Sequence, residues 1–171
     1  NYLYSSKSSI VLIQNDFELE KPVVPTLIRV KDPNESFSIL LEHFSRNKRK
    51  LSGISENSII KDNVKYSDDL YFGDYSICNS YSTIGKNVKI YSQVYIGESV
   101  VIGDNVLIYP GVKIYDKSKI GNNCIIHSGT VIGSDGFGFN LDSTGKQKKV
   151  LHNGNVILEN NVEIGANCTI D

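Results

Sequence analysis

Large apolar side chains recur at every sixth position over most of this chain. Fourteen such positions follow one another, and Cys78 is the least hydrophobic of them. They are Ile54, Ile60, Tyr66, Phe72, Cys78, Ile84, Ile90, Ile96, Ile102, Ile108, Ile114, Ile120, Ile126 and Ile132. A second series, four residues later, holds small or β-branched side chains, and Leu70 is its only large member. A repeat this long indicates one structural unit used many times.

The six-residue spacing excludes the two commonest regular structures. Six residues advance an α-helix by about 600°, so the apolar side chains would not share one face. An antiparallel sheet would alternate at every second residue between hairpin turns. Short strands joined by tight corners satisfy the spacing if three hexads close one triangular coil with the large side chain inside. Stacked coils then pair their strands about 4.8 Å apart.

Asparagine or glycine often lies three residues after the large position, where each corner is expected. These residues are Asn63, Asn87, Asn105, Gly111, Asn123 and Gly129. Both residue types adopt positive φ at low cost. We therefore predict a mainly β protein, a parallel β-helix over residues 54–171 in which each coil is stabilised by its neighbours.

The hexad register breaks once, after Ile132, and resumes at Leu158, Ile164 and Ile170. The intervening stretch, about 136–157, is predicted to be an insertion that leaves one coil and returns to it. Insertions in solenoid proteins often lie on the binding face.

The first fifty residues follow a different pattern, which indicates a small α/β domain over residues 1–50. The apolar runs Ile10–Ile13 and Leu27–Val30 predict two buried strands. Asp32 as N-cap, with Pro33 and Glu35 after it, predicts the start of a helix. Its apolar face would consist of Phe37, Leu40, Leu41 and Phe44. The basic residues Arg46, Lys48, Arg49 and Lys50 then suit the negative end of that helix better than a patch for an acidic partner.

Composition narrows the class of protein further. The chain has 171 residues and a net charge of -1, which argues against a nucleic-acid or anionic-membrane surface. We expect no membrane span, because no apolar run approaches about 18 residues. The three cysteines show no metal-ligand spacing and suit a reducing, cytoplasmic setting. Cys124 and Cys168 occupy small inward positions, so we expect core thiols there.

The hexads match the pattern [Ile/Leu/Val]-Gly-x-Asn-[small]-x, and the chain therefore resembles the hexapeptide-repeat superfamily. That resemblance implies a left-handed coil, which the spacing alone does not give. The superfamily includes acyltransferases, carbonic-anhydrase-like metal enzymes and non-catalytic scaffolds. We expect no metal site, because the coils contain a single histidine, His127, and a metal site needs several converging ligands.

Two stretches sharpen the resemblance, the run Gly133-Ser-Asp-Gly-Phe-Gly-Phe139 and the segment Val162–Asp171. With the insertion between them they are similar to UDP-3-O-(3-hydroxyacyl)glucosamine N-acyltransferases of lipid A biosynthesis. Val30-Lys-Asp-Pro33 and the preceding strands resemble the uridine-binding domain of that family. The resemblance covers the whole chain, and is weaker at its start.

The resemblance implies a reaction, its partners and the place of its catalytic group. A 3-hydroxyacyl group would pass from the phosphopantetheine arm of acyl carrier protein to the 2-amine of UDP-3-O-acyl-glucosamine, with no other cofactor. The family works as a homotrimer with active sites between neighbouring coils. Its general-base histidine lies in coils beyond the segment ending at Asp171, so we expect no catalytic residue here and no activity from this chain alone. Part of the uracil-stacking wall is likewise expected before Asn1.

The predicted substrate-binding residues are Asp135, Gly136, Phe137, Gly138, Phe139 and His127. The run from Asp135 to Phe139 either shapes a substrate cleft or only turns the chain out of its coil, with the phenylalanines packed back on the wall. It lacks the lysine of a phosphate loop. His127 either contacts ligand or is a surface or interface histidine.

For the remaining histidines and the basic residues of the insertion, we favour structural or solvated roles over ligand binding. His43 and His152 are expected to be structural or solvated. Lys146, Lys148 and Lys149 fit a solvated loop tip better than a site for phosphate or an acidic carrier protein.

Two other functions stay open. The related O-acyltransferase of UDP-N-acetylglucosamine begins directly with coils, so residues 1–50 argue against it. A non-catalytic hexapeptide scaffold or oligomerisation module has the same coils, and binding of a uridine nucleotide would distinguish it from the transferase.

Overall fold

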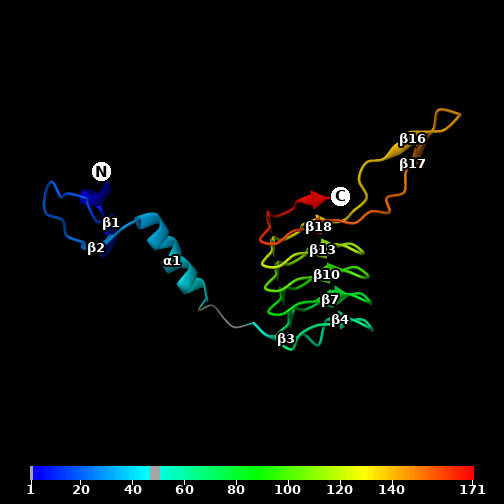
Figure 1. The fold of residues 1–171 in the computed structure, drawn as a ribbon, viewed down its shortest axis with the longest axis horizontal. Coiled ribbons are helices and arrows are strands. Elements are labelled where there is room, and N and C mark those ends of the chain that lie inside the picture. Colours follow the sequence, from blue (N-terminus) through cyan, green and yellow to red (C-terminus); the bar gives the residue numbers. More distant parts are fainter. Residues whose placement is uncertain (1, 47–50) are drawn as a thin grey trace. The chain divides into compact units, whose positions relative to one another are not determined.

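The computed structural model describes residues 2–46 and 51–171 (Figure 1). The chain divides into two compact units, Asn1–Lys50 and Leu51–Asp171, each with its own contacts. In the described part of the chain, no helix has the length and apolar character needed to cross a bilayer.

The first unit is a two-stranded parallel sheet with one helix. After the short 3-10 helix η1 (Tyr2–Ser5), strand β1 (Ile10–Gln14) pairs in parallel with β2 (Thr26–Val30). Helix α1 (Pro33–Arg46) then follows.

The N-terminus of α1 has the predicted cap. The backbone N–H groups of Asn34 and Glu35 donate to Asp32 Oδ1 at 2.8 and 3.1 Å. The cap satisfies two of the four N–H groups that every helix leaves without an internal partner. The predicted helix start is therefore confirmed.

The predicted burial of this unit is wrong. Ile13 and Pro25 are its buried residues among those described, while Ile10, Phe37, Leu40 and Leu41 are exposed. Two strands and one helix are too few to cover each other's apolar faces. The side chains of Phe44 and Arg46, and residues Lys48, Arg49 and Lys50 entirely, lie outside the described residues.

The second unit is a parallel β-helix with three faces, as predicted. One face consists of β7 (Thr83–Ile84), β10 (Val101–Ile102), β13 (Lys119–Ile120) and β18 (Ile157–Leu158). The next consists of β3 (Gly53–Ile54), β5 (Tyr71–Phe72), β8 (Lys89–Ile90), β11 (Leu107–Ile108), β14 (Ile125–Ile126) and β19 (Glu163–Ile164). The third consists of β4 (Ile59–Ile60), β6 (Ile77–Cys78), β9 (Tyr95–Ile96), β12 (Lys113–Ile114), β15 (Val131–Ile132) and β20 (Thr169–Ile170). Every pair within these faces is parallel and in hexad register, as in Ile102 against Ile84 and Ile120.

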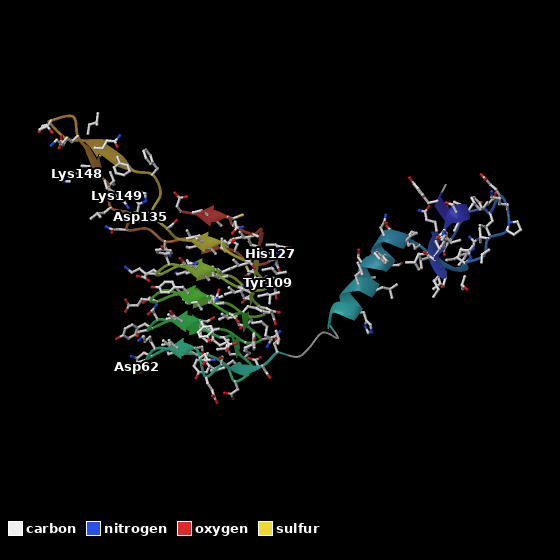
Figure 2. All side chains as sticks on the ribbon, turned by 180° about the vertical axis from the view of Figure 1, so that it is seen from behind. Asp62, Tyr109, His127, Asp135, Lys148 and Lys149 are labelled. Atoms are coloured by element: carbon white, nitrogen blue, oxygen red, sulfur yellow. The ribbon has the colours of Figure 1, made fainter. Side chains whose placement is uncertain are left out.

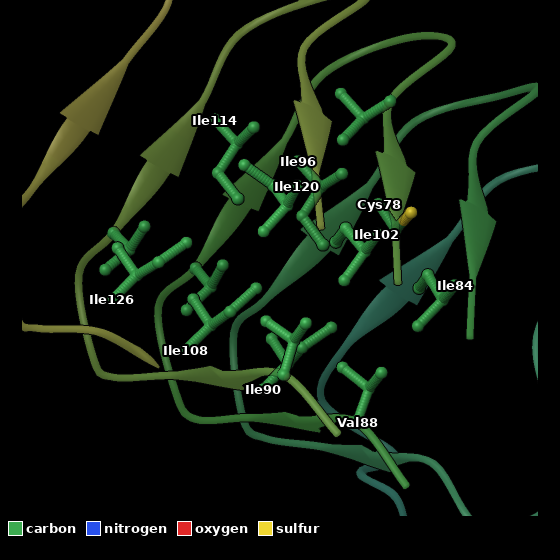
Figure 3. Packing of buried hydrophobic residues seen from close by; sticks show 14 of the residues in the cluster. Cys78, Ile84, Val88, Ile90, Ile96, Ile102, Ile108, Ile114, Ile120 and Ile126 are labelled. Atoms are coloured by element: carbon green, nitrogen blue, oxygen red, sulfur yellow. The ribbon is translucent and has the colours of Figure 1, made fainter. Parts of the chain in front are cut away.

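The predicted hexad residues fill the interior of the coils (Figure 3). Every member from Phe72 to Ile132 is buried, as is every member of the small series from Leu70 to Thr130. Ile54 and Tyr66 are 43% and 46% exposed, because they belong to the first coil and have a neighbouring coil on one side only.

The cysteines divide between the core and the surface. Cys78 and Cys124 are buried, and burial raises the pKa of the Cys78 thiol to about 11, so that it stays protonated. The expectation of a core thiol at Cys168 is wrong. Cys168 is exposed because its coil is the last of this chain and no further coil of the chain covers it.

All six predicted corner residues adopt positive φ, between 53° and 77°. Side-chain amides also join successive corners: Asn87 donates to Asn105 at 2.9 Å, and Asn105 donates to Asn123 at 3.1 Å. Asparagine therefore gives the corner both its backbone geometry and a hydrogen bond to the next coil. The same corner in other coils holds Tyr75, Tyr81, Gln93, Ser99 and Lys117, all at positive φ.

Buried hydroxyls in the small series tie one coil to the next. Ser82 Oγ donates a hydrogen bond to the carbonyl of Gly97, 15 residues further along, at 3.0 Å. It also accepts a hydrogen bond from the N–H of Val100, 18 residues further along, at 3.0 Å. Ser118 occupies the equivalent position, but its Oγ is buried without a hydrogen-bond partner in the described part of the chain. Its partners would fall at Gly133 and Gly136, where the chain leaves the coil.

We expect Ser82→Ala to lower the stability of the β-helix and Ser118→Ala not to lower it. Ser82→Ala leaves a buried N–H and a buried carbonyl unpaired and should lower the free energy of unfolding by about 1–3 kcal/mol. Ser118→Ala removes a hydroxyl that already lacks a partner and should leave stability unchanged or raise it. Urea unfolding followed by circular dichroism measures both, and equal losses would contradict the assignment.

Candidate functional site

The insertion leaves the coil after β15 through Gly133, whose φ is +81°. It forms a hairpin of β16 (Phe139–Leu141) and antiparallel β17 (Gln147–Lys149) before the chain re-enters the coil at β18. Figure 2 shows this hairpin standing away from the stacked coils.

An open cleft of about 360 Å³ lies at the root of the insertion. Its lining is polar and apolar in nearly equal parts and consists of Gly133, Ser134, Asp135, His152, Gly154, Asn155, Val156 and Asp171. A second cleft of about 280 Å³ shares Asp135 and His152 with it and extends to Tyr115, Asp116 and Lys117. Asp135 and His152 therefore stand where the two hollows meet. We call the first of them the root cleft.

His152 is held by the backbone on the opposite side of the root. Its Nδ1 accepts a hydrogen bond from the Gly136 N–H at 2.9 Å. In the neutral ring the proton is then on Nε2. A Cβ added at Gly138 would lie 2.7 Å from that Nε2, so the ring lies close against the backbone of Gly138 and would have to shift if a side chain were added there.

The expectation of a merely solvated or structural His152 is incomplete, because the ring also lines the root cleft. The Gly-x-Gly spacing of Gly136 and Gly138 was the signal in the sequence that something packs closely against the exit strand. Which side chain does so could not be read from the sequence.

Asp135, a predicted site residue, lies in the root cleft and forms an ion pair with Lys149. The hydrogen bond from Lys149 is the main cause that lowers the pKa of the Asp135 carboxyl. Lys149 thus anchors the base of the hairpin (Figure 2), and its expected place at a solvated tip is wrong. Lys148 faces Asn140 across the hairpin and lies outside the root cleft.

Phe137 and Phe139 contact each other, with ring centroids 5.1 Å apart and planes tilted by 53°. Phe137 is 89% exposed, so it does not pack back onto the coil wall. The structure therefore places an exposed aromatic pair just beyond the root cleft.

His127 lies on another wall of the β-helix, apart from Asp135 (Figure 2). Its ring stacks on Tyr109 at 5.0 Å, and Tyr109 stacks on Tyr91 at 5.4 Å. His127 Nε2 lies 2.8 Å from Glu163 Oε1. We call Tyr91, Tyr109 and His127 the ring stack. The predicted site residues thus divide between the root cleft with its aromatic pair and the ring stack.

The root cleft combines hydrogen-bonding groups with carboxylates. Ser134, Asn155 and His152 can exchange hydrogen bonds with a polar ligand, and Asp135 and Asp171 can only accept them once ionised. In residues 2–46 and 51–171, no group of three or more His, Cys, Asp or Glu side chains is placed to hold a metal ion. The groups that line the root cleft could therefore form hydrogen bonds with a polar ligand that bears hydroxyl or amine groups.

Comparison with known proteins places these features in a family. The bacterial transferase hexapeptide family, described by six repeats, matches residues 81–114 and 99–134. A UDP-3-O-acylglucosamine N-acyltransferase of Christiangramia forsetii is 48% identical over 171 residues, which are 100% of this chain and 50% of that protein. UDP-3-O-acylglucosamine N-acyltransferase 1 of Legionella pneumophila is 44% identical over 98% of this chain and 46% of its own length. A solved perosamine N-acetyltransferase of Caulobacter crescentus aligns with a TM-score of 0.43 at 12% identity, covering 87% of this chain and 71% of that one, which is too weak to support an assignment.

The fold and the matched repeats define a hexapeptide-repeat transferase. Both units and the insertion lie within the region matched by the curated relatives. The chain belongs to the UDP-3-O-acylglucosamine N-acyltransferase family, and it spans about half the length of the curated relatives it matches.

Proposed function

We propose that this chain is part of an N-acyltransferase that moves a 3-hydroxyacyl group from acyl carrier protein to the 2-amine of UDP-3-O-acyl-glucosamine, a step of lipid A biosynthesis. The observation that carries the proposal is the 48% identity over all 171 residues to a relative named for N-acylation of this UDP-sugar. An identity of that extent includes the first unit, the coils and the insertion together.

The first unit is proposed to hold the uridine. It has a cleft of about 360 Å³ of its own, between β1 and the start of α1. The lining combines hydroxyls with apolar surface and consists of Ser6, Ser8, Ile10, Val11, Leu12, Pro33, Asn34 and Phe37. A flat base could stack on the Phe37 ring, while the serine hydroxyls exchange hydrogen bonds with its polar edge.

The chemical step needs a base, because the ammonium form of an amine cannot attack a thioester. An imidazole titrates near neutral pH and suits this role. His152 is a poor candidate, because its acceptor nitrogen Nδ1 is already occupied by the Gly136 N–H. His127 is a poor candidate because it stacks on Tyr109 on another wall of the β-helix, apart from the root cleft (Figure 2). We propose that the base lies in the part of the protein beyond Asp171. The phosphopantetheine arm would supply the acyl group, so no other cofactor is required.

The ring stack supports a proposed homotrimer. It presents three half-buried rings on one wall, and aromatic side chains are enriched in subunit interfaces. We further place the reaction in the cytoplasm, because the three cysteines are free thiols.

The proposal is tested by an acyl-transfer assay read by mass spectrometry. The test protein is a full-length hybrid in which this chain replaces the matching half of the Christiangramia forsetii relative. With 3-hydroxyacyl carrier protein and UDP-3-O-acyl-glucosamine, the hybrid should form the N-acylated product, and the 171-residue chain alone should form none.

A folded hybrid that forms no product, from a chain that also binds no UDP, would overturn the proposal. That result would favour the non-catalytic scaffold instead. Turnover by the 171-residue chain alone would overturn the placement of the base beyond Asp171.

A further inference from the structure

We propose that Asn153 is a site of spontaneous deamidation in the folded protein, at which the backbone nitrogen of Gly154 displaces the side-chain amide as ammonia. The product is a mixture of aspartate and isoaspartate at this position. The modification does not depend on the proposed function, because it requires only the chain itself and water.

The reaction is balanced by groups that the chain supplies. Asparagine is among the thermolabile residues of proteins. The Gly154 nitrogen attacks Asn153 Cγ, the bond from Cγ to Nδ2 breaks, and the proton of the Gly154 N–H leaves with the amide as ammonia. Water then opens the resulting succinimide at Cγ to give aspartate, or at the backbone carbonyl of Asn153 to give isoaspartate. In isoaspartate the main chain runs through the side chain and is longer by one carbon.

The glycine gives the attacking nitrogen its access to Cγ. An asparagine followed by a glycine occurs once in the sequence, at Asn153 and Gly154. Glycine has no Cβ to obstruct the approach and adopts backbone conformations that other residues avoid. A Cβ added at Gly154 would meet no atom within 4 Å, so the surrounding chain also leaves space for the nitrogen to move.

Neither reacting group is held in place by the fold. In residues 2–46 and 51–171, no hydrogen bond engages the Gly154 N–H or the Asn153 carboxamide. Residues 150–156 form neither helix nor strand, and residues 151–155 are exposed. This segment can therefore reach the geometry of the succinimide without breaking the strand pairs of the coils.

Hydrogen bonds do hold the carboxamides of comparable asparagines. Asn79 also precedes a small residue, a serine, but its Nδ2 donates to the Ile96 carbonyl at 2.9 Å. Asn155 lies in the same irregular segment as Asn153, and its Nδ2 donates to the Lys117 carbonyl at 2.8 Å. A carboxamide held in this way does not turn its Cγ toward the next backbone nitrogen. In the folded chain we therefore expect reaction at Asn153 and not at the two held residues.

Isoaspartate at this position would disturb a contact across the root of the insertion. His152 directly precedes Asn153 and accepts a hydrogen bond from the Gly136 N–H at 2.9 Å. The extra main-chain carbon of isoaspartate displaces the chain beside that ring, whereas aspartate adds only a negative charge. We expect isoaspartate to open the hydrogen bond and to expose the Gly136 N–H to exchange with water.

The modification is measured by incubating the purified chain at mildly alkaline pH, both folded and in urea, and mapping its peptides by mass spectrometry. In the folded chain the peptide with Asn153 should gain the mass of an amide-to-acid conversion at a rate close to that in urea. The peptide with Asn79 should react in urea and be protected in the folded chain. A carboxyl methyltransferase specific for isoaspartate then distinguishes the two products, which have the same mass.

Two variants isolate the cause and the consequence. Gly154→Ala should lose most of the product, because its methyl group obstructs the attack on Cγ. Hydrogen exchange should show a faster loss of protection at the Gly136 N–H in the isoaspartate form than in the fresh chain. Asn153→Asp is the matched control, because it carries the charge on an ordinary main chain and should keep the original exchange rate.

Each part of the proposal has its own contrary result. A folded chain that stays unmodified at Asn153 would overturn the site, whether or not the chain in urea reacts. Equal product from Gly154→Ala would overturn the role assigned to the glycine. Unchanged exchange at the Gly136 N–H in the isoaspartate form would overturn the displacement of His152.

Discussion

Replacing Ile108 by alanine is expected to lower the free energy of unfolding of the β-helix by about 2–5 kcal/mol. Ile108 is fully buried on β11, near the middle of the six-stranded face. Hydrogen-bonded strands hold Ile90 below it and Ile126 above it at fixed separations. The coils cannot move together to fill the space, so the substitution leaves a cavity in addition to the lost burial.

Urea unfolding followed by circular dichroism provides the measurement. The matched control is Ile157→Ala, which removes the same atoms from a side chain that is 56% exposed on β18. It should change the free energy of unfolding by less than about 1 kcal/mol. Equal losses at the two positions would show that the hexad isoleucines do not form the core.

Gly103→Ala is expected to destabilise the β-helix by about 3 kcal/mol or more, which is the upper range for overpacking. Gly103 directly follows the hexad residue Ile102. A Cβ there would lie 2.9 Å from the backbone N of Asn122 and 2.9 Å from the backbone C of Gly121, both in the next coil. Backbone atoms in a paired strand cannot rotate away as a side chain can, so the two coils must separate.

Gly154→Ala is the control for this substitution. Its added Cβ would meet no atom within 4 Å, and Gly154 does not require positive φ. We expect a change within about 0.5 kcal/mol for Gly154→Ala. A thermal midpoint for Gly103→Ala as high as that of the control would contradict the close approach of the coils.

Much of the fold could be predicted from sequence spacing, because each coil repeats one local solution. The hexad isoleucines and valines point inward as the period requires, and Asn87, Asn105 and Asn123 occupy corners at positive φ. The start of α1 could likewise be predicted from a local pattern, because Asp32 accepts hydrogen bonds from the N–H groups of residues two and three positions further along. The hand of the coil came from the resemblance, not from the spacing.

Other features needed the tertiary structure, because they depend on residues that are far apart in the chain. Tyr75 and Lys117 adopt positive φ although neither favours it, since coils above and below impose the corner on them. Cys168 fits the inward series by spacing, and only its place in the last coil exposes it.

The candidate site shows the same division. The sequence located the insertion and singled out Asp135, Gly136 and the phenylalanines, because a break in a regular repeat is visible without coordinates. The ion pair of Asp135 with Lys149 and the hydrogen bond from the Gly136 N–H to His152 could not be predicted from the sequence. Both contacts depend on how the two strands of the hairpin pair. The period of six thus determined the coils of this protein, whereas contacts across the root of the insertion, between residues far apart in the chain, decided the shape of the root cleft.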